Sequence, residues 1–151
     1  MRNERDGGRK TGLRVVLDTN VYVAAFHFPE GMCAQLVEFA AEQHYELIIS
    51  PVIIREFSGA SRRDFLVNEE KHVRFLKFLG KIATIVVPRI IPDVIREDPS
   101  DNHILACALT GKTNLIVSQD LDLLRLKTYG ATGIISPTDF LNTLEGYKKV
   151  A

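Results

Sequence analysis

The chain has 151 residues, of which 46% are hydrophobic and 25% are charged, a size and composition that fit one soluble globular domain. Its 19 Lys and Arg balance 19 Asp and Glu, so binding of a polyanion would need a local basic patch. No apolar run approaches the roughly 20 residues of a membrane span, and the start of the chain lacks the hydrophobic stretch of a secretory signal. We therefore expect a cytoplasmic protein without a membrane segment.

Three parts are expected along the chain: a flexible lead over residues 1–12, a single domain over 13–145 and a C-terminal tail over 146–151. No repeat, low-complexity tract or linker rich in Pro, Gly and Ser divides the central part. Cys33 and Cys107 lie far apart in apolar helical patterns. This placement favours two buried thiols in a reducing compartment over a disulfide.

Short β-branched segments alternate with longer segments of helical periodicity. Strands are expected at residues 13–17, 46–50, 84–87 and 114–118 and in a short segment near Ile135. Helical spacing or a helix-start signal indicates helices that begin near Met32, Ser50, Asn68, Asp98, Asp122 and Ser136. This alternation predicts a three-layer α/β/α sandwich with a central, mostly parallel sheet of about five strands. Any reactive crevice would lie beyond the carboxyl ends of those strands.

Two acidic residues directly follow apolar strands. Asp18 ends the first strand, inside the segment RVVLDTNVYVAAF, where burial of an isolated carboxylate is costly unless it is paired or bound to a metal. Asp120 follows the fourth strand, in IVSQDLD. A turn or cap role stays open for Asp18, and both Asp120 and Asp122 are compatible with ordinary loop acids.

Two further acids lie on the apolar faces of predicted helices. In SPVIIREF, Glu56 follows two apolar residues by one turn, with a solvent-facing glutamate at the helix edge as the alternative. Asp101 begins the apolar stripe of DNHILACAL. A structural reading stays open there, because Asp98 can cap the helix and an acid three residues later suits a capping box. Asp139 occupies the same position in SPTDF and is assigned to capping.

The four acids Asp18, Glu56, Asp101 and Asp120 all lie at the carboxyl end of a strand or near the start of the next helix. In a parallel sheet these positions share one edge, so the carboxylates would converge there and repel one another unless a cation binds. Oxygen ligands without His or Cys suit Mg²⁺ or Mn²⁺ rather than zinc. The four histidines show no ligand spacing, and His103 is expected to be an exposed helix residue.

Four segments of the chain occur in an order that resembles PIN-domain ribonucleases. They are VVLDTNVYVAA, SPVIIREF, EDPSDNHILACAL and IVSQDLDLL, and each has the expected strand or helix. The resemblance covers about residues 13–144 and is closest to the prokaryotic branch that includes toxin components of toxin–antitoxin systems. It implies a PIN-like fold with central parallel strands and helices on both sides, and many family members are dimers.

The resemblance also implies a role for particular residues. The acidic site that binds Mg²⁺ or Mn²⁺ and carries catalysis would be Asp18, Glu56, Asp101 and Asp120. Supporting positions would be Thr19, Asn20, Ser118, Asp98 and Asp122. Ser118 stands where the family commonly has Thr, and the doubled acid in DPSD makes Asp98 a cap or an outer partner of Asp101. The implied reaction is hydrolysis of phosphodiester bonds in single-stranded RNA to give 5′-phosphate products.

Binding of substrate would depend on local cations. Residues in predicted loops or at helix ends are the RNA-binding candidates: Arg62, Arg63, Arg96, Lys112, Arg125 and Lys127. For a toxin, the expected protein partners are a small antitoxin and a second copy of the chain in a homodimer.

A toxin ribonuclease is not the only function that the sequence allows. A housekeeping RNA-processing nuclease and a non-catalytic PIN-like module that binds RNA or protein both stay open. A phosphotransfer domain does not fit. A receiver domain needs paired acids after the first strand and a lysine beyond the last strand, and a haloacid-dehalogenase-like phosphatase needs an aspartate where Asn20 stands.

Overall fold

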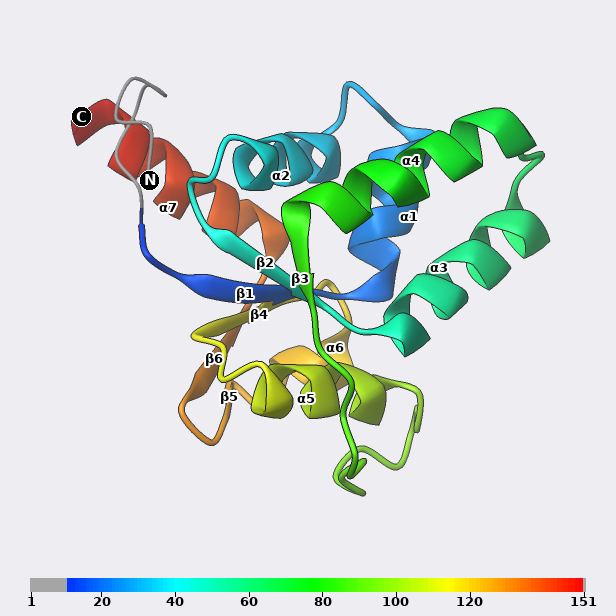
Figure 1. Ribbon diagram of the computed structural model, residues 1–151. Coiled ribbons are helices and arrows are strands. Elements are labelled where there is room, and N and C mark those ends of the chain that lie inside the picture. The colour runs from blue at the N-terminus through cyan, green and yellow to red at the C-terminus, as the bar shows by residue number, and fades with distance from the viewer. Residues whose placement is uncertain (1–10, 151) are drawn as a thin grey trace.

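The computed structural model describes residues 11–150, with side chains described through Tyr147. Residues 1–10 of the expected lead lie outside this part, as does Ala151. The described residues form a central sheet with helices on both faces (Figure 1). The predicted three-layer α/β/α architecture is therefore confirmed.

Within the described residues the sheet has six strands, in the order β3-β2-β1-β4-β6-β5. Their bounds are β1 Arg14–Leu17, β2 Glu46–Ile49, β3 Ala83–Ile85, β4 Leu115–Val117, β5 Thr128–Tyr129 and β6 Thr132–Ile135. Neighbouring strands are parallel except for the antiparallel pair β5 and β6. The carboxyl ends of all the parallel strands therefore meet at one edge.

The described helices are α1 Thr19–His27, α2 Met32–Ala41, α3 Pro51–Asp64, α4 Glu69–Ile82, α5 Asp101–Thr110, α6 Leu121–Leu124 and α7 Pro137–Val150. Helices α1, α2, α4 and α7 lie on one face of the sheet and α5 lies on the other (Figure 1). Helix α3 contacts both α1 and α5. In residues 11–150 no helix is long and apolar enough to cross a membrane.

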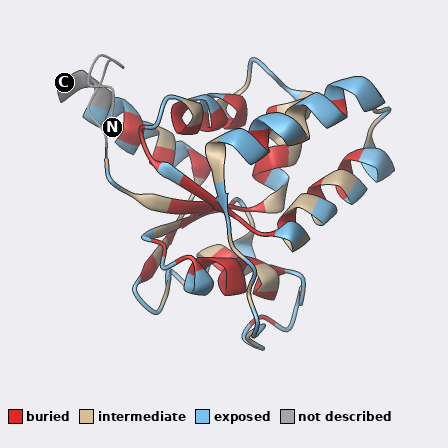
Figure 2. Cartoon of the chain, viewed as in Figure 1, coloured by how far each residue is buried: buried red, intermediate tan, exposed pale blue. Residues whose placement is uncertain are grey.

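The core lies in the central strands and the helix faces turned toward them (Figure 2). Residues 15–17 of β1 are fully buried, and residues 47–49 of β2 are at most 1% exposed. Strand β1 is therefore covered on both faces, as its continuous apolar run predicts. Cys33 and Cys107 are both buried free thiols, as the sequence predicts.

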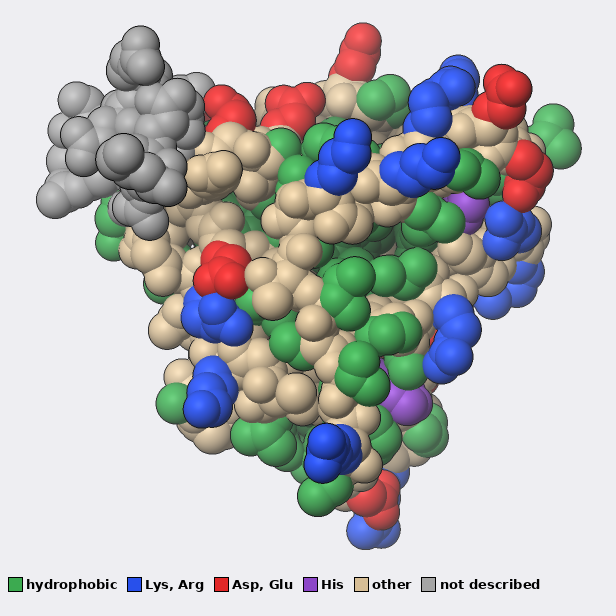
Figure 3. Space-filling view, in the orientation of Figure 1, with side chains coloured by type: hydrophobic (Ala, Val, Ile, Leu, Met, Phe, Trp, Pro, Cys, Tyr) green, Lys and Arg blue, Asp and Glu red, His purple; other side chains and the backbone are tan. Residues whose placement is uncertain are grey.

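The surface at the β3 edge of the sheet is apolar. Ile85, Val87 and Ile90, in β3 and the segment after it, are exposed. Figure 3 shows hydrophobic side chains gathered over this part of the molecule, whereas Lys and Arg side chains are spread over the same face. This scatter agrees with the balanced charge of the sequence.

Two elements of the structure were not marked by the sequence. Helix α1 starts directly after Asp18, which stands at the N-cap position but makes no capping hydrogen bond through its side chain. The buried or half-buried apolar residues of α1 lie all around the helix, so no amphipathic period marks it. Strand β5 has two residues, which form a hairpin with β6 around a turn containing Gly130 at φ +59°. A strand of that length has too few residues to show a pattern.

The start of α5 differs from its predicted position. The sequence placed the start at Asp98 and Pro99, but the helix begins at Asp101. The N–H groups of Asp101 and Asn102 donate to the carbonyls of Asp98 and Pro99 at 3.0 and 3.1 Å. These bonds span three residues, so a tight turn precedes the helix and takes Asp98 out of its first turn.

Candidate metal centre

Strands β1 and β4 bring two acids together at the carboxyl edge of the sheet. The strands pair in parallel with Leu17 opposite Val117, and the N–H of Asp18 donates to the carbonyl of Val117 at 2.9 Å. Asp18 therefore leaves the sheet beside the end of β4, where the chain continues to Asp120.

Ser118 links these two acids. Its hydroxyl donates to Asp18 Oδ2 at 2.7 Å and accepts from the N–H of Asp120 at 2.9 Å. The N–H of Asp122 donates to Asp120 Oδ1 at 2.8 Å. Because Ser118 is fully buried, water does not compete for its hydroxyl bonds to the two acidic residues.

Helix α3 carries Glu56 to the same place. Ser50 caps this helix by accepting from the N–H of Ile53 at 3.4 Å, and Pro51 is its first residue, as the sequence predicts. Thr19, at the start of α1, donates its hydroxyl to Glu56 Oε2 at 3.3 Å. Glu56 is half-buried, and this bond ties it to the residue after Asp18.

Asp101 is 5% exposed in the first turn of α5, and its neighbour Asn102 is also buried. Asn102 Oδ1 accepts from the N–H groups of Val94 and Ile95 at 3.1 and 2.9 Å, and its amide donates to the Ile95 carbonyl at 2.8 Å. Asn102 thus ties the loop between β3 and α5 to the first turn of α5. Asn102 was not predicted from the sequence, although it is a second polar residue beside Asp101 in an otherwise apolar stretch.

Asp98 lies close to two of the other acids. One carboxylate oxygen from each of Asp98, Asp101 and Asp120 lies within 4.8 Å of the other two. Asp98 Oδ1 also accepts from the N–H and the hydroxyl of Ser100, at 3.2 and 2.6 Å. Ser100 is the residue that precedes α5, so Asp98 is not the helix cap that the sequence offered as one reading.

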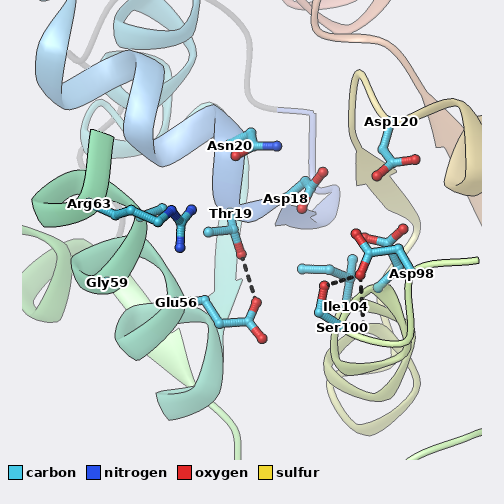
Figure 4. A pocket seen from close by; sticks show the side chains of 12 residues that line it. Asp18, Thr19, Asn20, Glu56, Gly59, Arg63, Asp98, Ser100, Ile104 and Asp120 are labelled. Carbon is cyan, nitrogen blue, oxygen red and sulfur yellow. Dashed lines mark hydrogen bonds between the residues drawn. The ribbon is translucent and has the colours of Figure 1, made fainter. Parts of the chain in front are cut away.

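These acids line a cavity of about 390 Å³. Figure 4 shows Glu56 and Arg63 on one side, Asp98 and Asp120 on the other, and Asp18 between them. The lining residues are Asp18, Thr19, Asn20, Glu56, Gly59, Ala60, Arg63, Asp98, Ser100, Asp101, Ile104 and Asp120. All four acids that the sequence put forward line it, together with three of the supporting residues. The other two, Ser118 and Asp122, act from behind it or lie outside its lining.

Burial and mutual repulsion raise the pKa values of these acids. The pKa of Asp101 is raised to about 8, first by burial and then by the charges of Asp120, Asp18 and Asp98. Burial raises the pKa of Asp18 to about 6, although hydrogen bonds from Ser118 and the Thr19 N–H favour its charged form. Burial also raises the pKa of Glu56, against the effect of nearby His103. The chain alone therefore does not offset the cost of charging these three carboxyl groups.

The arrangement fits a divalent cation. Asp101 Oδ2 is buried and has no hydrogen-bond partner among the described residues, a costly state for a carboxylate that a cation would relieve. The acidic groups that line the cavity offer only oxygen ligands, and its lining contains no His or Cys. Hard oxygen ligands of this kind suit Mg²⁺ or Mn²⁺.

The RNA-binding candidates are separated by the structure. Arg63 lines the cavity and pairs with the adjacent Asp64 at 3.2 Å. Arg62 pairs with Glu69 at 2.7 Å and Arg125 pairs with Asp122 at 3.2 Å, and neither lines the cavity. Lys112 follows α5 at the end of the sheet opposite the acids, where Arg14 begins β1 and binds the neighbouring Gly111 carbonyl. Arg96 and Lys127 are exposed outside the cavity lining.

Residues 14–122, which include every acid described above, match the model of the PIN domain family. The chain belongs to the PIN domain family. PIN domains form a nuclease superfamily and are generally dependent on divalent metals. This PIN domain is 28% identical over 122 residues to the uncharacterized protein MJ1680 of Methanocaldococcus jannaschii, covering 78% of this chain and 77% of that protein.

Two solved structures are similar to this PIN domain. PAE2754 from Pyrobaculum aerophilum superimposes with a TM-score of 0.61 at 19% identity, covering 91% of this chain and 92% of that one. VapBC2 from Rickettsia felis, solved bound to a DNA fragment from its promoter, gives a TM-score of 0.56 at 14% identity, covering 82% and 98%. At these identities the likeness shows a shared fold.

Proposed function

We propose that this PIN domain is a divalent-metal-dependent endoribonuclease that hydrolyses phosphodiester bonds in single-stranded RNA. The observation that carries the proposal is the convergence of five carboxylates, from four separate places in the fold, on one cavity. Family membership supports nuclease chemistry. A non-catalytic binding module would not need so many acids at so poorly solvated a site.

The residues proposed to hold Mg²⁺ or Mn²⁺ are Asp18, Glu56, Asp101 and Asp120. A bound ion supplies a lowered pKa for an attacking water and stabilises charge on the oxygens of the scissile phosphate. The chain supplies orientation, because Ser118 fixes Asp18 and Asp120 and Thr19 fixes Glu56.

Arg63 is proposed to bind the RNA backbone at the cavity. It approaches from the side of α3, opposite Asp98 and Asp120 (Figure 4). A guanidinium there balances part of the acidic charge and offers a fork of donors to a phosphate. It thus gives a polyanion a place to bind beside carboxylates that would otherwise repel it.

The proposal is tested by cleavage of a 5′-labelled single-stranded RNA with Mn²⁺. The wild-type protein should cleave with Mn²⁺ and lose all cleavage in EDTA, while Asp101→Asn should be inactive with the ion present. Asp139→Asn is the matched control, because Asp139 is exposed in the first turn of α7 and outside the cavity lining. Cleavage that persists in EDTA, or in Asp101→Asn, would contradict the proposal.

We further propose that the nuclease is the toxin of a toxin–antitoxin pair, acts in the cytoplasm and forms a homodimer. The structural likeness to VapBC2 supports an antitoxin partner. A small reading frame beside this gene, whose product binds the protein and restores growth of cells that express it, is the expected finding. Expression of the active protein without any effect on growth would favour housekeeping RNA processing.

A further inference from the structure

We propose that Asp98 is a direct metal ligand, and that Asp98, Asp101 and Asp120 form a three-carboxylate cluster on the α5 side of the cavity. This inference rests on the proposed function and adds a fifth acid to the four marked by the sequence. It concerns the residue whose role the sequence left between helix cap and outer partner.

The distances suit binding of one ion. With ion–oxygen distances of roughly 2.0–2.6 Å, three oxygens spaced evenly around one ion lie about 3.5–4.5 Å apart. One carboxylate oxygen from each of Asp98, Asp101 and Asp120 lies within 4.8 Å of the other two. A single ion can therefore contact all three with only small movements of the side chains.

A separate observation points to a ligand at this place. Asp101 is 95% buried, as its exposed fraction of 5% shows, and it lines the same cavity. Its Oδ2 atom has no hydrogen-bond partner among the residues that the structure describes. A buried carboxylate without a donor must either take up a proton or have a positive group beside it, and the neighbouring groups are the carboxylates of Asp98 and Asp120.

Hydrogen bonds from the chain orient the other two members. Ser100 donates its N–H and its hydroxyl to Asp98 Oδ1, and the Asp122 N–H donates to Asp120 Oδ1. In each case these hydrogen bonds reach Oδ1 of the carboxylate, which leaves Oδ2 for an ion. Each side chain is therefore fixed by one oxygen and can bind through the other.

Titration calorimetry of Mn²⁺ into the full chain tests the assignment. Asp98→Asn keeps an Oδ1 acceptor for Ser100 but loses the charged ligand, so we expect Mn²⁺ affinity to fall at least about tenfold. Its melting temperature in EDTA should stay within a degree or two of wild type. Ser100→Ala keeps every charge but removes one donor to Asp98, and a fall of a few-fold is expected.

Asp139→Asn is the matched control. Asp139 is exposed in the first turn of α7 and does not line the cavity, so the affinity of this variant should stay within twofold of wild type. Wild-type affinity in Asp98→Asn, or an equal loss in Asp139→Asn, would overturn the inference. A lower melting temperature in EDTA with unchanged affinity would assign Asp98 to the turn alone. Absence of Mn²⁺ binding by the wild-type protein would instead contradict the proposed function itself.

Discussion

At the scale of single residues, Ser118 has an unusual position, because one buried hydroxyl serves two acids. It donates to Asp18, and this bond favours the charged form of that carboxylate. It also accepts from the backbone of Asp120, whose N–H would otherwise lose its partner. Loss of the hydroxyl should therefore affect both sides of the metal site at once.

We expect Ser118→Ala to lower Mn²⁺ affinity about tenfold, in the range measured when groups that orient metal ligands are removed. The measurement is titration calorimetry at constant pH. Ser136→Ala is the control, because Ser136 accepts from the N–H of Asp139 at the start of α7, outside the cavity lining. Equal affinities for wild type and Ser118→Ala would contradict the role assigned to this hydroxyl.

Asp101 gives the metal-free protein a characteristic dependence on pH. Its pKa is raised to about 8 in the folded state, so the folded protein holds this proton more tightly than the unfolded chain does. The resulting stability is complete below the unfolded pKa near 4 and is lost as pH rises through about 8. From pH 7 to pH 9 the free energy of unfolding in EDTA should fall by about 1 kcal/mol through this group.

The measurement is urea unfolding of wild type and Asp101→Asn at both pH values. The buried thiols Cys33 and Cys107 also have raised pKa values and lower the stability of both proteins at high pH. The difference between the two proteins isolates Asp101. Asp101→Asn should lose less stability than wild type, and equal losses would show that Asp101 is charged throughout.

The acids that could be identified from sequence are those that interrupt apolar segments. Asp18 and Asp101 stand out because a charge there has to be explained by a partner. Asp98 could not be placed, since DPSD is equally compatible with a cap and with a ligand. The sequence also could not show that Arg63 lines the cavity and Arg62 does not. The directions of these two adjacent side chains depend on where α3 ends and on how α4 packs.

At the scale of elements, the end of α5 packs tightly on the sheet. A Cβ atom at Gly111 would lie 2.6 Å from Ile48 Cγ2 in β2 and 3.1 Å from the Cys107 carbonyl. Gly111 has φ −79°, so space rather than backbone conformation requires glycine there. This contact sets how closely α5, and with it Asp101, approaches the central strands.

Gly111→Ala should lower the free energy of unfolding by about 1–3 kcal/mol, as expected for a group forced into a packed core. Gly80→Ala is the opposite case, because a Cβ there meets nothing within 4 Å in the exposed part of α4. It should raise stability by about 0.5–1 kcal/mol through helix propensity. Urea unfolding measures both, and a Gly111→Ala protein as stable as wild type would contradict the packing.

The elements predicted best are those with a strong local signal. The apolar strands and the Ser50–Pro51 helix start were predicted within a residue or two. Helix α1 was missed because its apolar residues surround it, and β5 because two residues carry no period. The start of α5 was misplaced because a turn with hydrogen bonds over three residues precedes it, which depends on backbone geometry rather than residue type.

At the scale of the whole molecule, balanced charge means that RNA binding depends on where single cations lie. Both arginines of this pair have an acidic partner, Asp64 for Arg63 and Glu69 for Arg62, but Arg63 also lines the acidic cavity and Arg62 does not. The two residues form a natural comparison, because they have the same charge and adjacent places in α3. Only one is positioned to contact a phosphate near the acids.

In an inactive Asp101→Asn background, Arg63→Gln should weaken binding of a labelled single-stranded RNA, with a salt dependence reduced by about one unit of slope. Arg62→Gln should bind within twofold of the background protein. Fluorescence anisotropy over a series of salt concentrations measures both. An equal loss for the two variants would mean that general charge, rather than the position of Arg63, attracts RNA.

The architecture was predictable because the alternation of strands and helices leaves few topologies, and parallel strands bring their carboxyl ends to one edge. That same rule predicted that Asp18 and Asp120 meet, since both follow strands of one sheet. It could not predict which cations face the acids or which loop residues close the cavity. Those depend on the packing of α3 and α5 around it.

Anomalous diffraction from a crystal of the wild-type protein soaked in Mn²⁺ tests the central claim most directly. The account predicts a peak inside the cavity, within bonding distance of Asp101 and Asp120, that disappears in crystals of Asp101→Asn. Two results would contradict this claim: no peak in the cavity at an Mn²⁺ concentration that gives peaks at other sites, or acidic side chains that point away from one another.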